Sequence, residues 1–540
     1  MKNKGQILLG IFAVALLVAM VWKLLAGSEY IDIPFGDDSM YLFFSRFMQE
    51  KIFPDYGPMY VGTLKVFTLF TGDIIETSIK ARIFHLIIPA IALIYLSIRY
   101  RIGWGLTALL VVAFLSSPWV ADFGFFRPLI SHPALAIILA WTGWVKDKSL
   151  KQIWLSAILL MLVIMYYRPE QILGFLMALA LSAVLMIYKW KKQEWSKRTV
   201  SAFVLIYFFA IIIIMLVGKP IGAGGKRSGL AILQHVSLNY LQEEGDINAW
   251  QNHVYFMDYL PKMFGMSGKI KSMPTDADIL FQKGKPLLLM HFRRNVIQYA
   301  NNWLYMGHVI MPYGTPIILS YIFSIIIFVV FIFHRKKGTV SKEKLSVMII
   351  LLLCIITITA TSILIYPRVH YFLFALPFFY FMCMEVLNSN RRIVDNIMFQ
   401  YGALIMAFCY FLLMPSMYSK PLEKLGGADN KLTHIPAIRT LWTLNINDTV
   451  GILDRDMGLV LYMPRNYKLT DFNMDTTFIP FIMQKNMKVI YYNHTLRNDR
   501  HFALDTTFQN FVKEGYKNKY NKIPIPNTED TFIVAKELLH

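Results

Sequence analysis

Charged residues are scarce in this chain of 540 residues. They make up 16% of the sequence, where soluble globular proteins carry about 25%, and hydrophobic residues reach 56%. The mean hydropathy is +0.47. The apolar residues also form long runs, among them Leu106–Leu115, Leu155–Met165, Phe203–Val217 and Ile317–Phe333. This composition excludes an ordinary soluble enzyme and a disordered protein, and it predicts a chain that crosses a membrane many times.

Cysteines are also few, and the three that are present, Cys354, Cys383 and Cys409, all lie in apolar runs. They cannot form a disulfide in an exported domain, so they do not indicate the redox compartment, and the apolar composition already excludes a secreted disulfide scaffold. The chain also lacks an internal repeat, a low-complexity tract and the glycine fingerprint of a dinucleotide-binding fold.

Acidic residues are outnumbered, with 34 Asp and Glu against 54 Lys and Arg, and the net charge is +20. In a soluble chain this excess would suggest a nucleic-acid partner. In a membrane protein, cytoplasmic loops collect Lys and Arg because these residues resist translocation. We therefore expect membrane lipids, and no nucleic acid, as partners.

The spacing of the apolar segments predicts about eleven transmembrane helices, since one span needs about 20 mostly apolar residues. Lys2 and Lys4 precede the first span, which predicts an N-terminus on the inner side. Lys23 and the absence of a small-residue cleavage site make this span a signal anchor. The predicted spans lie near residues 6–25, 79–98, 103–121, 130–146, 152–166, 170–188, 199–217, 312–333, 345–365, 370–388 and 396–414.

The basic residues are consistent with this count, because every loop that it puts inside is basic. Eleven spans also put the C-terminus outside. The inside loops carry Arg99 and Arg101, then Lys146, Lys148 and Lys151, then Lys189 to Arg198, then Arg335 to Lys344, and finally Arg391 and Arg392.

Three larger segments are predicted outside, at residues 28–77, 218–310 and 418–540. In the first, apolar residues at helical spacing predict juxtamembrane helices at Asp38–Phe53 and Tyr60–Phe70, both too short to be counted as spans. The last segment is more polar and predicts a small extracytoplasmic α/β domain that follows a membrane module at 1–417. We expect strands at Val450–Leu453, Leu459–Tyr462, Val489–Tyr492 and Thr531–Ala535, and helices at Phe478–Lys485 and Thr507–Tyr516.

Two adjacent acids, Asp37 and Asp38, follow the first span. In one interpretation they cap a helix and favour its dipole. In the other, a carboxylate at the outer face deprotonates an acceptor or holds a divalent cation.

Three short outer loops carry arginine beside proline, at Arg127, Arg168 and Arg368. Each arginine alone could snorkel to lipid phosphates. Three that face one side suggest a site for a phosphate or pyrophosphate, which guanidinium binds bidentately. Asp122 shares the loop of Arg127 and is a candidate second acid. His132, Glu170 and His370 are expected to be satisfied polar ends of spans.

The long outer loop contains a predicted helix at Pro286–Tyr305 and carries basic and aromatic residues. Trp303 and Tyr305 either belong to the aromatic belt of the membrane or stack on a sugar or isoprenoid. The predicted spans hold almost no ionisable residue at mid-span, with Glu385 and Lys23 near span ends. This scarcity counts against an ion-coupled transporter, whose ion needs ligands at depth.

The order of these motifs resembles the GT-C superfamily of polytopic glycosyltransferases. The resemblance is to the branch of bacterial lipid A aminoarabinose transferases and protein O-mannosyltransferases. Asp37-Asp38-Ser39-Met40-Tyr41 matches a D-[DE]-x-x-Y pattern, and the turn YGPMY at Tyr56–Tyr60 leads into an apolar surface helix. The run YPRVHYFLFALPFFYF at Tyr366–Phe381 and the outer α/β domain complete the likeness.

The resemblance implies an enzyme of a bacterial cytoplasmic membrane that moves a sugar from a polyprenyl-phosphate carrier to a lipid, glycan or protein acceptor on the outer face. Asp37 would be the general base of an inverting displacement, with Asp38 as the alternative, and arginines would stabilise the departing phosphate. A divalent cation is a candidate cofactor, since relatives with and without metal exist. The expected substrate-binding residues are Tyr41, Tyr56, Asp122, Arg127, Arg168, Glu170, Trp303, Arg368 and His370.

Two alternatives stay open. An O-antigen ligase or polymerase would depend on Arg293, Arg294 or His308 of the long loop and tolerate loss of Asp37. A flippase or transporter of lipid-linked sugars would form no glycosidic bond, and polar residues would be expected at mid-span.

Overall fold

The computed structural model describes most of the chain. The described residues are 2–27, 32–33, 37–48, 52, 57–117, 126–220, 224–249, 256–264, 284–310, 341–413, 433–444, 450–455, 458–463, 467–469, 478–499, 502 and 505–539, with isolated positions between 318 and 329.

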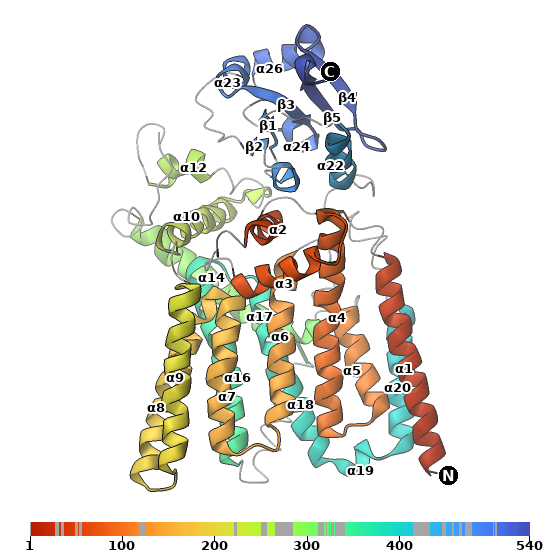
Figure 1. The fold of residues 1–540 in the computed structure, drawn as a ribbon, viewed down its shortest axis with the longest axis vertical. Coiled ribbons are helices and arrows are strands. Elements are labelled where there is room, and N and C mark those ends of the chain that lie inside the picture. The colour runs from red at the N-terminus through yellow and green to blue at the C-terminus, as the bar shows by residue number, and fades with distance from the viewer. Residues whose placement is uncertain are drawn as a thin grey trace.

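Long helices lie side by side in a bundle, and a small sheet domain stands beyond one end of it (Figure 1). The bundle consists of α1 (Lys2–Gly27), α4 (Ile74–Tyr100), α5 (Trp104–Ser116), α6 (Phe126–Val145), α7 (Leu150–Tyr167), α8 (Ile172–Lys191), α9 (Lys197–Val217), α16 (Lys342–Ile365), α18 (Leu376–Ser389) and α20 (Ile397–Leu413).

Seven helical segments among the described residues are long and apolar enough to cross a membrane. Two predicted spans, those of α5 and α20, form shorter apolar helices of 13 and 17 residues. The predicted span at 312–333 lies almost entirely outside the described residues. The mainly helical membrane architecture is therefore supported, whereas the count of eleven spans stays a prediction.

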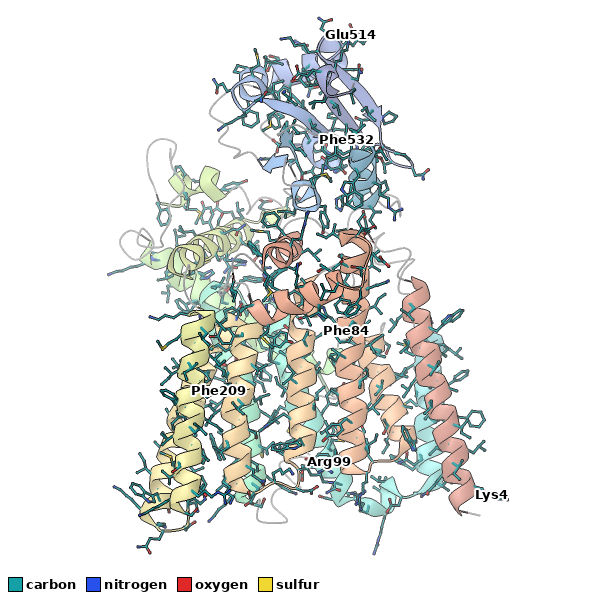
Figure 2. The ribbon with its side chains drawn as sticks, in the orientation of Figure 1. Lys4, Phe84, Arg99, Phe209, Glu514 and Phe532 are labelled. Atoms are coloured by element: carbon teal, nitrogen blue, oxygen red, sulfur yellow. The ribbon has the colours of Figure 1, made fainter. Side chains whose placement is uncertain are left out.

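The two ends of the bundle differ in charge. The N-terminus and the basic turns around Arg99, Lys146 and Arg391 lie at the end far from the sheet, which we call the basic end (Figures 1 and 2). The opposite end, called the domain end, faces the sheet and carries six further helices. These are α2 (Asp37–Phe47), α3 (Pro58–Thr68), α10 (Gly224–Glu243), α12 (Phe256–Met263), α14 (Lys285–Ile310) and α17 (Val369–Phe372).

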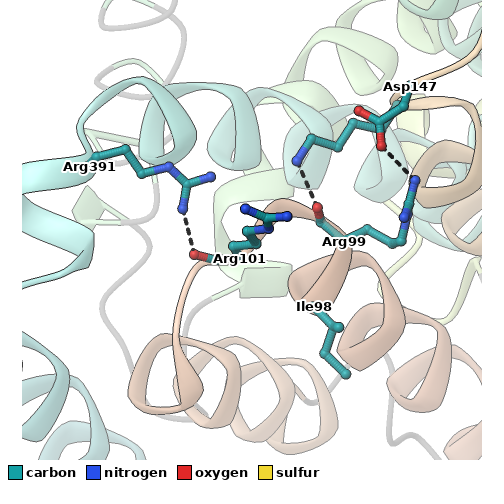
Figure 3. Close-up of a pocket in the computed structure, with 6 residues that line it drawn as sticks. Ile98, Arg99, Arg101, Asp147 and Arg391 are labelled. Carbon is teal, nitrogen blue, oxygen red and sulfur yellow. Dashed lines mark hydrogen bonds and ion pairs between the residues drawn. The ribbon is translucent and has the colours of Figure 1, made fainter. Parts of the chain in front are cut away.

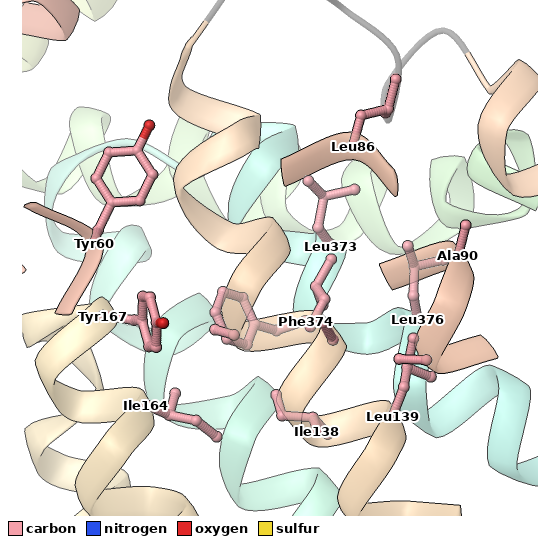
Figure 4. Close-up of a cluster of buried hydrophobic side chains, with 14 of the residues drawn as sticks. Tyr60, Leu86, Ala90, Ile138, Leu139, Ile164, Tyr167, Leu373, Phe374 and Leu376 are labelled. Carbon is pink, nitrogen blue, oxygen red and sulfur yellow. The ribbon is translucent and has the colours of Figure 1, made fainter. Parts of the chain in front are cut away.

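The interior of the bundle is apolar, and so is much of its outer surface. Leu86, Leu139 and Phe374 are fully buried between α4, α6 and the chain that precedes α18 (Figure 4). On α9, in contrast, large side chains such as Met215 and Phe209 are exposed, and Figure 2 labels Phe209. A helix that is apolar on both faces is suited to hydrocarbon, because lipid replaces the protein contacts on the outer face.

The C-terminal domain is a five-stranded sheet with the order β2-β1-β3-β5-β4. The β1–β2 and β1–β3 pairs are parallel, and β3–β5 and β5–β4 are antiparallel. Helices α22, α23 and α26 belong to the same domain. The strands and helices of the domain are β1 (Val450–Leu453), β2 (Tyr467–Leu469), β3 (Met487–Tyr492), β4 (Tyr520–Pro524), β5 (Thr531–Ala535), α22 (His434–Thr443), α23 (Phe478–Gln484) and α26 (Thr506–Asn510).

One predicted strand of this domain is wrong. Leu459–Tyr462 forms a 3₁₀ turn, η6, because the Asp454 carboxylate accepts hydrogen bonds from the amides of Gly458 and Leu459, at 2.9 and 2.6 Å, and turns the chain. A short apolar run does not distinguish a strand from a helical turn. Two strands, β2 and β4, were missed. Both lie at the edges of the sheet, and β4 is polar and ends at Pro524.

The turn at Gly57 fixes α3 against the end of α7. Gly57 has φ +66°, and a Cβ at this position would lie 2.4 Å from the carbonyl oxygen of Tyr167. The Gly57 carbonyl in turn accepts the amide of Tyr60 at 2.9 Å and begins the helix. Both the backbone conformation and the close approach therefore require glycine.

We predict that Gly57→Ala destabilises the protein more than Gly245→Ala. Gly245 also has a positive φ, +80°, but an added Cβ would meet nothing within 4 Å, so its substitution costs only about 1–2 kcal/mol of backbone strain. At Gly57 the clash with Tyr167 adds to this strain. Thermal unfolding in detergent, followed with a thiol-reactive dye that reports exposure of the buried Cys354, checks the ranking. Equal shifts would show that the α3–α7 contact relaxes without cost.

Candidate functional site

Arg168 lies at the domain end of α7 and is buried, with 6% of its surface exposed. Its guanidinium carbon lies 5.4 Å from the centre of the Tyr371 ring. Its Nε and Nη2 atoms donate no hydrogen bond, and no carboxylate of the described residues forms an ion pair with it. The side chain of Glu170 nearby in sequence also leaves a buried oxygen, Oε2, without a partner. Arg168 is therefore a buried cation without an anion.

The backbone around Arg168 is held firmly. Its amide donates to Ile164 at 2.8 Å, and its carbonyl accepts the amide of Gln171 at 2.9 Å. The Gln171 side chain joins this turn to α16, donating to the Cys354 carbonyl and accepting from Thr357, both at 2.6 Å. These bonds fix the position of the arginine before any ligand binds.

Arg368 precedes α17, the single helical turn after α16. Its Nη2 lies 2.9 Å from His235 Nε2, and the His235 ring stacks on Tyr366 with centres 5.5 Å apart. His370 lies against Tyr371 with ring centres 4.3 Å apart. Tyr371 thus contacts both His370 and Arg168, so the predicted residues of two separate loops meet at α17.

Helix α14 supports α17 from the long loop. Asn302 donates to the Pro367 carbonyl at 2.5 Å, and Asn295 donates to the Ile363 carbonyl at 2.7 Å. Trp303 is half-buried and packs edge-on against Phe372, with ring centres 5.6 Å apart. Its observed role is to hold α17, and this contact is one that the sequence did not predict.

The remaining predicted residues lie on α2 or outside the described side chains. Asp37 and Asp38 are the first two residues of α2, and their side chains are not described. Tyr41 on the same helix contacts Tyr60 of α3, with ring centres 5.4 Å apart. The predicted residues whose side chains fall outside the described part are Tyr56, Asp122 and Arg127.

Within the bundle, α4 and α6 carry buried polar residues, and two of them, Arg82 and His85, were not predicted from the sequence. Arg82, His85 and His132 are all almost fully buried, and they fall inside the predicted spans 79–98 and 130–146. All three lie in the halves of their predicted spans nearer the domain end, so they do not contradict the expected scarcity of ionisable residues at mid-span. The signal was present in the sequence, because Arg82 and His85 are three residues apart and so share one face of α4.

The histidines are not satisfied by the protein. Neither ring nitrogen of His85 or His132 forms a hydrogen bond in the described structure. The expectation that His132 and Glu170 are satisfied span ends is thus also wrong. The centre of the His85 ring lies 5.1 Å from that of Tyr60, and Tyr60 contacts Tyr41, so ring contacts connect His85 to α2.

The C-terminal domain is tied to the segment that bears the acids. The Asp32 carboxylate accepts the amides of Thr433, His434 and Ile435, at 2.8 to 3.0 Å, and so caps α22. Arg46 of α2 donates to the carbonyls of Leu461 and Met463 in the domain, at 3.4 and 3.1 Å. Beside Arg46 lies an open hollow of about 360 Å³, also lined by Thr68, Thr71, Gly72, Asp73, Ile74, Thr77, Trp442 and Tyr462.

Among the described residues, no group of three or more His, Cys, Asp or Glu side chains is arranged to hold a metal ion. No protein-family model and no curated protein sequence matches the chain.

We predict that Arg168→Met leaves the stability of the protein unchanged or raises it. Replacing a buried charge that has no partner removes a desolvation cost without breaking an ion pair. Arg455→Met is the matched control, because the Arg455 side chain is only 12% exposed and pairs with the buried Asp499, and leaving a buried charge without its partner costs roughly 3–5 kcal/mol. Thermal unfolding monitored by tryptophan fluorescence compares the two. A loss at Arg168 as large as that at Arg455 would mean that Arg168 has a structural role.

Proposed function

We propose that this protein is a membrane glycosyltransferase that takes a sugar from a polyprenyl-phosphate carrier and joins it to an acceptor at the domain end of the bundle. The observation that carries the proposal is the buried guanidinium of Arg168, which has no anionic partner in the described structure.

A phosphate on a lipid carrier fits the surroundings of Arg168. An unpaired buried cation costs several kcal/mol, and an anionic ligand that pairs with it recovers that energy. Guanidinium binds phosphate through two parallel hydrogen bonds, and Nε and Nη2 form the edge that can do so. The apolar bundle surface next to this end suits an isoprenoid chain, so the carrier's phosphate and its tail would both be accommodated.

The acids at the start of α2 supply the other half of the reaction. In our proposal Asp37, or alternatively Asp38, accepts the proton of an acceptor hydroxyl as its oxygen attacks the anomeric carbon. The bond between that carbon and the phosphate oxygen breaks, and the sugar configuration is inverted. Arg168 stabilises the negative charge that grows on the departing polyprenyl phosphate.

The orientation in the membrane follows from charge. The basic end would face the cytoplasm, because its turns carry the lysines and arginines that resist translocation. The domain end, with α2 and the sheet, would then face outward in a bacterial cytoplasmic membrane. The hollow beside Arg46 is lined by Trp442, Tyr462 and several threonines. Aromatic rings and hydroxyls are suited to contact a sugar, so in our proposal the acceptor enters through this hollow.

One observation favours a second candidate, a flippase for lipid-linked sugars. Arg82, His85 and His132 are buried in α4 and α6, and polar residues inside the bundle are what a path for a polar headgroup would need. A flippase moves the intact carrier and forms no glycosidic bond, so the product of the reaction separates the two candidates.

We predict that Asp37→Asn or Asp38→Asn lowers sugar transfer at least 100-fold, as loss of a general base does. The assay uses purified protein in lipid with radiolabelled polyprenyl-phosphate sugars and a mixture of acceptor lipids and glycans. Asp395→Asn, which changes an exposed acid at the basic end, is the control and should keep full activity.

Full transfer by both variants would contradict the assignment of the base. It would favour the alternative enzyme, which depends on Arg293, Arg294 or His308 of the long loop. Movement of the carrier across the bilayer by the wild type, with no transfer to any acceptor, would instead establish the flippase.

A further inference from the structure

A second charged hollow lies at the basic end, far from the candidate site, and no step of the proposed reaction uses it. Its volume is about 360 Å³. It is formed where α4 and α6 end and α19 (Arg391–Val394) begins (Figure 3). The residues that line it are Ile98, Arg99, Arg101, Lys146, Asp147 and Arg391.

The hollow holds four cations and one acid. Asp147 pairs with Arg99 at 2.7 Å. Lys146 donates to the Arg99 carbonyl at 2.7 Å, and Arg391 donates to the Arg101 carbonyl at 2.8 Å. Carbonyls satisfy these donors but carry no net charge, so three positive charges of the hollow remain uncompensated.

Arg101 has neither a hydrogen bond from its guanidinium nor an ion pair in the described structure, and its side chain is exposed. Figure 3 shows it between Arg391 and Arg99. It also has a positive φ, +55°, as the residue that caps α4. Glycine or asparagine normally occupies such a cap, because other residues are strained there. An arginine in this strained conformation is therefore a candidate for a functional role, such as binding an anion.

The cations of the hollow repel one another. Burial lowers the pKa of Lys146, and the charges of Arg391, Arg99 and Arg101 lower it further, while Asp147 acts in the opposite sense. An anion bound between these side chains would relieve the repulsion.

The apolar surroundings indicate where that anion comes from. Ile91, Tyr95 and Ile98 lie on one exposed face of α4, at helical spacing, and this stripe runs into the hollow at Ile98, which is 54% exposed. Trp144 of α6 is exposed beside the same turn, with the Lys148 ammonium 5.0 Å from its ring centre. A charged hollow that continues into an apolar stripe suits a phosphate attached to an acyl chain.

We propose that this hollow binds the phosphate headgroup of an anionic phospholipid in the leaflet at the basic end, with the acyl chains along the Ile91–Ile98 face of α4. Basic pockets between membrane helices on the cytoplasmic side are suited to such headgroups. The proposal does not depend on the proposed transferase activity.

The test measures lipid binding rather than activity. Purified protein is titrated with phosphatidylglycerol in phosphatidylcholine nanodiscs, and bound lipid is counted by native mass spectrometry. Arg101→Asn removes the charge and places a favoured residue at the cap, so the variant folds at least as well as the wild type. Arg392→Gln removes an exposed cation next to the hollow and is the control for net charge.

We expect Arg101→Asn to weaken phosphatidylglycerol binding about fivefold, the effect of one basic residue near an anionic lipid surface. Arg392→Gln should bind like the wild type. Equal binding by Arg101→Asn and the wild type, or equal losses in the two variants, would overturn the site. Displacement of the lipid by millimolar inorganic phosphate would overturn the lipid source and assign the hollow to a soluble phosphate.

Discussion

Hydrocarbon offers no hydrogen-bond partner, and the arrangement of this chain follows from that constraint. The basic turns, the long loop and the sheet domain all lie at one end of the bundle or the other, where water and headgroups can reach them. Polar groups that remain inside must be paired by the protein or by a ligand. The few that are not paired therefore identify the places where a ligand is expected, foremost Arg168 and the His85 and His132 rings.

Both ends of the bundle use arginine, but in different ways. At the domain end Arg168 is buried, lies over the Tyr371 ring and has no anionic partner among the described residues, which in our proposal suits a phosphate on an apolar tail. At the basic end the arginines are more exposed and donate mostly to carbonyls at helix ends, which suits a headgroup that stays in place. The domain end also carries the acids of α2, and the sheet domain holds that helix through Arg46. The two ends of the bundle thus differ in how deeply their arginines are buried and in what those arginines contact.

Much of the fold could be predicted from the sequence, because apolar periodicity and the basic loops are one-dimensional signals. The surface helices α2 and α3 and the strands β1, β3 and β5 were located in this way. The turn at Leu459 could not be predicted, because it depends on hydrogen bonds to the Asp454 carboxylate. The polar edge strand β4 could not be predicted either, because it forms through pairing with β5. At the site, arginine beside proline identified Arg168 and Arg368, but their meeting at α17 depends on the packing of α14 from a distant loop. Arg82 and His85 were missed because the apolar residues around them dominate the segment.

The measurement that tests the central claim most directly is binding of a polyprenyl phosphate to the wild type, Arg168→Met and Arg294→Met in nanodiscs. Arg294 is a half-exposed arginine of the long loop that pairs with Glu243, so it controls for loss of one charge at the same end. The account predicts one bound carrier for the wild type, at least tenfold weaker binding for Arg168→Met and no change for Arg294→Met. It also predicts no competition from the same polyprenol without phosphate. Equal binding by the wild type and Arg168→Met would contradict the account.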